Sequence, residues 1–227
     1  MKRLFIIVFA AALLMVSAGC SGEENKISIP EATEALYTDS NGVGYNLDVD
    51  GNLTTASFKN KKKNIVIPEK YEGKSVTSVG KSTFKMSGAE SVAIPDSVTE
   101  IKDYAFAFSR YLEKVTIPES VKVIGTNAFS GCSMLTSVKL PKKLEEIGMY
   151  SFDASGLKEI TIPKSVKTVG EYAFAECKNL KKVTFKGKKT KIADTAFSKS
   201  ENVKFVAPMK SKAADFAKAN AIECKSK

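Results

Sequence analysis

The chain has 227 residues and a formal net charge of +10 at pH 7. It contains no histidine, which excludes Ser-His-Asp and Cys-His catalytic pairs and removes the commonest transition-metal ligand. The charge is uneven, because residues 178–227 contain fourteen lysines against four acidic residues and therefore hold the whole excess.

Residues 1–19 are predicted to be an export signal. Lys2 and Arg3 give a positive start, and the apolar run from Leu4 to Val16 is shorter than the roughly 20 residues of a membrane-spanning helix. The run leads into Ser17-Ala18-Gly19-Cys20, which resembles the lipobox of bacterial lipoproteins, although Ser17 stands where a large aliphatic residue is usual. The resemblance implies that Cys20 carries a lipid anchor in the membrane. The alternative is an ordinary secretory peptide in which Cys20 has no role.

The segment after the signal is expected to lead into a small cap. Residues 20–36 are polar and charged, as expected of a tether between anchor and domain. In residues 37–64, two β-type runs (44–49 and 53–58) flank Asp50-Gly51, a dipeptide typical of hairpin turns. This N-terminal β-hairpin is predicted to cover the open edge of the first repeat.

A phenylalanine returns every 22 or 23 residues through the middle of the chain. Such a period predicts stacked copies of one small unit, in which each turn buries its apolar side chains against its neighbours. The ring is expected to fill the interior of each turn. The six members are Phe84, Phe106, Phe129, Phe152, Phe174 and Phe197.

Each repeat also contains apolar residues at alternate positions, which predicts a short strand that turns these side chains inward. A proline follows each of the first five pairs and is expected to end the strand. Gly80, Gly125, Gly148 and Gly170, further along the repeat, are expected to let the chain bend sharply. The pattern predicts seven strands in a parallel sheet over residues 65–205, at Ile65/Ile67, Val92/Ile94, Val115/Ile117, Val138/Leu140, Ile160/Ile162, Val183/Phe185 and Val203/Phe205.

The repeat is clearest from Leu112 to Cys132, where it runs Leu-x-x-Val-x-Ile-Pro-x-x-Val-x-x-Ile-Gly-x-x-Ala-Phe-x-x-Cys. This unit resembles the BspA-like leucine-rich repeat family of bacterial surface proteins. The resemblance implies a β-rich solenoid of about six 22–23-residue repeats, and binding of a protein ligand, for instance in adhesion to a host or neighbouring cell. Residues 206–227 are expected to form a C-terminal cap, with a helix at 213–219.

Few residues offer chemistry. Cys132 and Cys177 follow the phenylalanine by three positions, where other repeats have serine, so a small residue at a tight inner turn explains them. They lie two turns apart, roughly 9–10 Å, which exceeds the about 7 Å limit for a disulfide. No nucleophile elbow, Ser-x-x-Lys pair or phosphate-binding loop occurs. We therefore expect no enzymatic activity, metal or other cofactor.

Two candidate binding surfaces remain. The outward middle positions of the strands predict a face for a protein ligand, made of Thr116, Lys139, Thr161, Thr184 and Lys204. The alternative is contact between the basic C-terminal end and an anionic envelope polymer, through Lys181, Lys182, Lys186, Lys188, Lys189 and Lys191. Nucleic acid is not expected, because the lysines lack interleaved aromatic residues and the protein is predicted to be exported.

Overall fold

The computed structural model describes residues 35–226. The predicted export signal, Cys20 and most of the predicted tether therefore lie outside the described residues. All the described residues belong to one compact unit, which spans residues 34–227. Within this described part, no helix is long and apolar enough to cross a bilayer.

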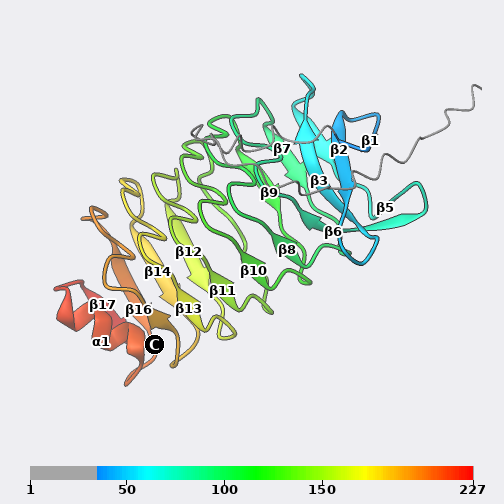
Figure 1. Ribbon diagram of the computed structural model, residues 1–227. Coiled ribbons are helices and arrows are strands. Elements are labelled where there is room, and N and C mark those ends of the chain that lie inside the picture. The colour runs from blue at the N-terminus through cyan, green and yellow to red at the C-terminus, as the bar shows by residue number, and fades with distance from the viewer. Residues whose placement is uncertain (1–34, 227) are drawn as a thin grey trace, which may run out of the picture. The chain divides into compact units, whose positions relative to one another are not determined.

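The predicted N-terminal hairpin is confirmed. Strands β2 (Val43–Leu47) and β3 (Leu53–Phe58) pair antiparallel, and β1 (Tyr37–Thr38) adds to the outer side of β2. On its other side β3 pairs parallel with β6 (Lys74–Val79), which joins the cap to the first turn of the solenoid (Figure 1). A second hairpin, between β5 (Lys70–Tyr71) and β6, was not predicted.

The predicted strands line one side of the solenoid in two short parallel sheets, which we together call the first sheet. β4 (Asn64–Val66), β7 (Ser91–Ala93) and β9 (Lys114–Thr116) form a three-stranded part. The four-stranded part contains β12 (Glu159–Ile162), β14 (Lys182–Phe185), β16 (Lys204–Ala207) and β17 (Cys224–Ser226). Six of the seven predicted strands are present, and β17 adds one that was not predicted.

The strand predicted at Val138/Leu140 is wrong. Leu140 is buried and Val138 is partly buried, as the alternating pattern requires. Within the described residues, however, Ser137–Leu140 forms no strand and makes no backbone hydrogen bond to either neighbouring turn. Alternation reports which side chains point inward, but it does not report whether two backbones approach closely enough to bond.

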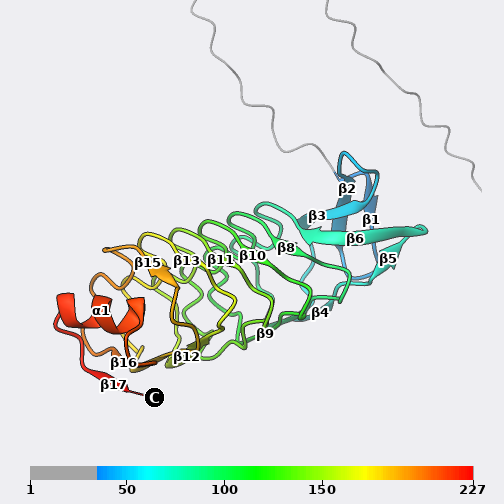
Figure 2. The ribbon, with the colours of Figure 1, turned by 90° about the horizontal axis from the view of Figure 1, so that it is seen from below.

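A second parallel sheet lies on the opposite side of the coil (Figure 2) and was not predicted. It continues from β6 through five two-residue strands, one per turn. The apolar second residue of each strand is buried in the core in the first four strands and packs partly buried against the core in the fifth. These strands are β8 (Glu100–Ile101), β10 (Val123–Ile124), β11 (Glu146–Ile147), β13 (Thr168–Val169) and β15 (Lys191–Ile192).

The six repeating phenylalanines form a continuous stack inside the solenoid, as predicted. Consecutive rings have centroids 5.0–5.4 Å apart and interplanar angles of 1–11°. The backbone joins the turns at the same level, because the Phe106 N–H donates to the Ala128 carbonyl at 2.8 Å and the Phe129 N–H to the Ser151 carbonyl at 2.7 Å. Side chains and backbone therefore link each turn to the next.

The recurring glycines do not serve the role predicted for them. None of the four has a positive φ; the left-handed residue of each bend lies two positions later, at Ser82, Asn127, Tyr150 and Tyr172, with φ of 54–59°. A Cβ on Gly148 would lie 2.8 Å from backbone of the preceding turn, and one on Gly80 would lie 1.7 Å from a backbone oxygen. These glycines are therefore required for the close approach of successive turns.

The predicted helix at the C-terminal end is confirmed as α1 (Lys212–Ala219). The Ser211 side chain caps its first turn by accepting a hydrogen bond from the Ala214 N–H at 3.2 Å. Ala213 and Ala217 are buried, and the Phe216 ring lies 6.1 Å from those of Phe197 and Phe205. The helix thus closes the end of the phenylalanine stack.

We expect Phe129→Ala to lower the free energy of unfolding by about 3–5 kcal/mol, because it removes a fully buried ring from the middle of the stack. The matched control is Phe108→Ala, at a ring that is 42% exposed, where the loss should stay near 0.5 kcal/mol. Denaturant unfolding followed by circular dichroism measures both. Equal losses at the two positions would contradict the role given to the stack.

Candidate functional site

An open groove of about 950 Å³ lies on the outward face of the first sheet. It runs over the segment Ser137–Leu140 and over β12 and β14, and it reaches Val206 and Ser226. Three of the five residues predicted for a binding face, Lys139, Thr161 and Thr184, line it. The structure therefore gathers most of the predicted face into one depression.

The other two predicted face residues lie outside this groove. Thr116 belongs to β9, in the three-stranded part of the first sheet. Lys204 lies at the start of β16, where its ammonium forms an ion pair with Glu223 at 2.6 Å. Neither lines the groove, so the predicted face is shorter than the row of strands suggested.

The groove combines apolar and basic surfaces. Its apolar residues are Val138, Leu140, Ile160, Pro163 and Val206, of which Val138 and Val206 are partly exposed and the other three are buried. Five lysines line it against a single carboxylate, Glu159, which pairs with one of them. The lysines are exposed and therefore attract an anionic group with a salt-dependent strength; they are Lys139, Lys142, Lys164, Lys182 and Lys186.

The structure distributes the six lysines predicted for an anionic polymer around one turn of the coil. Lys182 and Lys186 flank the groove, and Lys181 directly precedes β14. Lys188 and Lys189 lie on the connection to the other side, and Lys191 lies in β15 of the second sheet. A run of lysines along the sequence therefore does not make one basic patch, because the turn carries its members to different faces.

The two cysteines of the repeat have the predicted structural role. Cys132 and Cys177 are buried and free, and their thiols donate to the carbonyls of Phe106 and Phe152 at 3.2 and 3.1 Å. Ser200 makes the same bond to the Phe174 carbonyl at 2.7 Å. This position thus requires a small hydrogen-bond donor, a requirement that size alone did not reveal.

Burial makes these thiols poor nucleophiles. It raises the pKa of Cys132 to about 12, and it also raises the pKa of Cys177. Across residues 35–226, no group of three or more cysteine, aspartate or glutamate side chains could hold a metal ion. The geometry of the described residues therefore offers a binding surface as its clearest functional feature.

A family profile matches most of the solenoid. The family described as BspA type Leucine rich repeat region matches in six copies across residues 77–204. Among curated proteins, none matches the sequence significantly.

Several solved structures share the fold. A leucine-rich repeat protein from Bacteroides ovatus is 26% identical, with a TM-score of 0.61, and the match covers 73% of this chain and 54% of that one. A leucine-rich repeat protein from T. pallidum is 24% identical, with a TM-score of 0.68 and coverage of 75% and 81%. The pneumococcal vaccine antigen PcpA is 23% identical, with a TM-score of 0.55 and coverage of 82% and 48%. The chain thus spans about half the length of the first and third.

We expect a thiol reagent such as iodoacetamide to modify only Cys224 in folded residues 34–227, because Cys224 is exposed while Cys132 and Cys177 are buried. Mass spectrometry after reaction at about pH 8 should show one added group. The same protein unfolded in guanidinium should take three. Modification of Cys132 or Cys177 without unfolding would contradict the inner position given to this column.

Proposed function

The chain belongs to the BspA-type leucine-rich repeat family, and from this membership we propose that it is an exported, lipid-anchored surface protein that binds a protein ligand without catalysing a reaction. The groove on the first sheet is the proposed binding site. Adhesion to a host or neighbouring cell is the role that such binding would serve.

The single observation that supports the site most is the coincidence of the groove with the predicted face. Lys139, Thr161 and Thr184 come from three successive turns and take the same position in each. Successive turns are roughly 4.8 Å apart, so the three positions span about 10 Å, the length of three extended residues. Repeated positions of this kind suit an extended segment of a protein that crosses several turns.

Export and anchoring are proposed from the beginning of the sequence. Lys2 and Arg3, the apolar run after them and Cys20 make up the lipoprotein-like signal. Two acyl chains on Cys20 would hold the protein stably on a membrane, where one chain is marginal. Residues 20–36 would then connect the anchor to the solenoid.

An anionic envelope polymer is the second candidate ligand, favoured by the five lysines of the groove. A polymer of phosphates or carboxylates would use the lysines alone and would be released by salt. The partly exposed apolar residues of the groove, Val138 and Val206, would then contribute nothing, which is why we favour a protein with apolar side chains as the ligand.

The test blocks the groove with Thr161→Arg combined with Thr184→Arg, in residues 34–227. We expect capture of a discrete protein from a panel of purified extracellular-matrix proteins to persist at high salt and to fall at least about tenfold in this variant. The matched control, Thr99→Arg with Thr168→Arg, places two arginines at exposed threonines in and beside the second sheet and should leave capture unchanged.

The proposal of a protein ligand is contradicted if residues 34–227 retain purified envelope polymer and capture no matrix protein. That retention would disappear at high salt and on changing Lys142, Lys164 and Lys182 to serine, three exposed lysines that line the groove. Unfolding midpoints measured for every variant would exclude misfolding as the cause of a loss.

A further inference from the structure

The corner of the coil that follows the strands of the first sheet has charges in a definite order. The position after the strand-ending proline is acidic in the first three turns and basic in the next two. All five side chains are exposed. We call this set the corner stripe: Glu69, Asp96, Glu119, Lys142 and Lys164.

Neighbouring members of the corner stripe lie in adjacent turns at matching places. The pairing of β4 with β7 and of β7 with β9 sets Val66, Ala93 and Thr116 side by side, three residues before the three acidic members. The next turn has no paired strand at Ser137–Leu140. There the Lys142 N–H donates to a Glu119 carboxylate oxygen at 2.6 Å, which places Lys142 beside Glu119. The stripe therefore runs along the solenoid axis at roughly 4.8 Å per turn.

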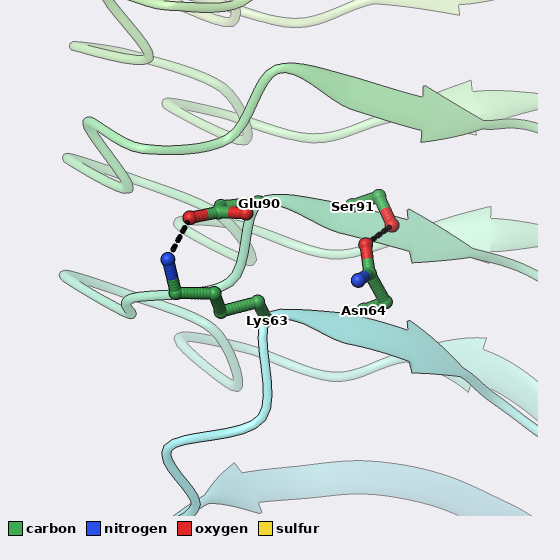
Figure 3. Close-up of polar contacts among 4 residues, drawn as sticks. All are labelled: Lys63, Asn64, Glu90 and Ser91. Atoms are coloured by element: carbon green, nitrogen blue, oxygen red, sulfur yellow. Dashed lines mark hydrogen bonds and ion pairs between the residues drawn. The ribbon is translucent and has the colours of Figure 1, made fainter.

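Some charged side chains of the described surface pair with an opposite charge in an adjacent turn. Lys63 and Glu90, for example, pair at 2.5 Å across adjacent turns, beside a hydrogen bond from Ser91 to Asn64 (Figure 3). Five further ion pairs also join neighbouring turns, namely Lys139–Glu119, Lys167–Glu145, Lys182–Glu159, Lys199–Glu176 and Lys204–Glu223.

The corner stripe is almost absent from these pairs. Among the described residues, Glu119 is the one member in an ion pair, and its distance to Lys139 is the longest of the six at 3.9 Å. Asp96 instead adjoins Glu119, and Lys142 adjoins Lys164, so like charges stand one turn apart and repel. A partner that brings opposite charges in the same order would relieve this repulsion.

A second copy of the chain has that order. If the second copy is rotated by 180° about an axis between Glu119 and Lys142, the two stripes face each other in opposite directions. Each of the four stripe residues from Asp96 to Lys164 then faces a residue of opposite charge. Glu119 then faces Lys142, and Asp96 faces Lys164. We propose that the corner stripe binds a second copy of this chain, antiparallel, in a twofold-symmetric dimer.

The chemistry favours a copy over other occupants. The two stripes have the same spacing by construction, whereas an unrelated protein would need both the order and the spacing. A polyanion would be repelled by the three acidic members. A twofold contact is also closed, so it gives a dimer and no filament.

The dimer would be reversible and sensitive to salt, because exposed ion pairs are weak and screened. Lys142 and Lys164 also line the groove, so dimerisation would compete with the proposed ligand. The inference does not depend on that ligand, and its test contains none.

The test is sedimentation velocity of residues 34–227, which form one compact unit, at about 20 mM and about 500 mM salt. We expect dimers at low salt that dissociate at high salt. The variant E69K/D96K/E119K and the variant K142E/K164E should each dissociate at least about tenfold more readily. An equimolar mixture of the two should form heterodimers, and one chain with all five changes should again form homodimers.

The matched control is K158E/K181E, which makes the same charge change as K142E/K164E. Its two exposed lysines directly precede β12 and β14, so they lie at the opposite ends of the strands from the corner stripe. It should dimerise like the unchanged chain. The proposal is overturned if the unchanged chain is monomeric at low salt, if the control dissociates equally, or if the folded five-change chain stays monomeric. Circular dichroism establishes that each variant is folded.

Discussion

The turn-to-turn stacking of phenylalanine rings is the interaction on which the rest of this structure depends. The centroid spacing of 5.0–5.4 Å is close to the roughly 4.8 Å between hydrogen-bonded strands, so one rise satisfies the rings, both sheets and the backbone bonds beside each ring. The glycines that face the preceding turn permit the same close approach. The hairpin at one end and α1 at the other then cover the exposed ends of the stack.

This constraint leaves the surface positions free to vary and fixes only their spacing. Each outward position becomes a column along the axis, and the choice of residue in that column decides the chemistry. In one column Lys139, Thr161 and Thr184 line a groove. In another, three acidic residues precede two lysines. The proposed ligand site and the proposed dimer contact are thus two uses of the same regular scaffold.

The sequence supported prediction where one physical requirement produces one pattern. Ring burial produces the 22–23-residue period, and a tight turn produces Asp50-Gly51, so the solenoid and the hairpin were predictable. The second sheet was not, because a two-residue strand such as Glu100–Ile101 is too short to show alternation. The break at Ser137–Leu140 depends on backbone approach, which inward-facing side chains do not report.

The site was predictable in part for the same reason. Alternation within a strand identifies Lys139, Thr161 and Thr184 as outward, and the structure adds that they share a groove. The lysines from Lys181 to Lys191 are close in the sequence but do not form one patch, because a single turn of the coil places them on different faces. The order of charges in the corner stripe can be recognised only when the register between adjacent turns shows which residues lie side by side.

Site-specific photo-cross-linking to the captured protein ligand would show directly which side of the solenoid binds it. A photoreactive residue would replace Thr184 in the groove or, in a separate protein, Thr168 on the second sheet. We expect a cross-linked ligand peptide from position 184 and none from position 168. Cross-links from position 168 alone would show that the ligand binds the opposite side of the solenoid and that the groove is not the binding site.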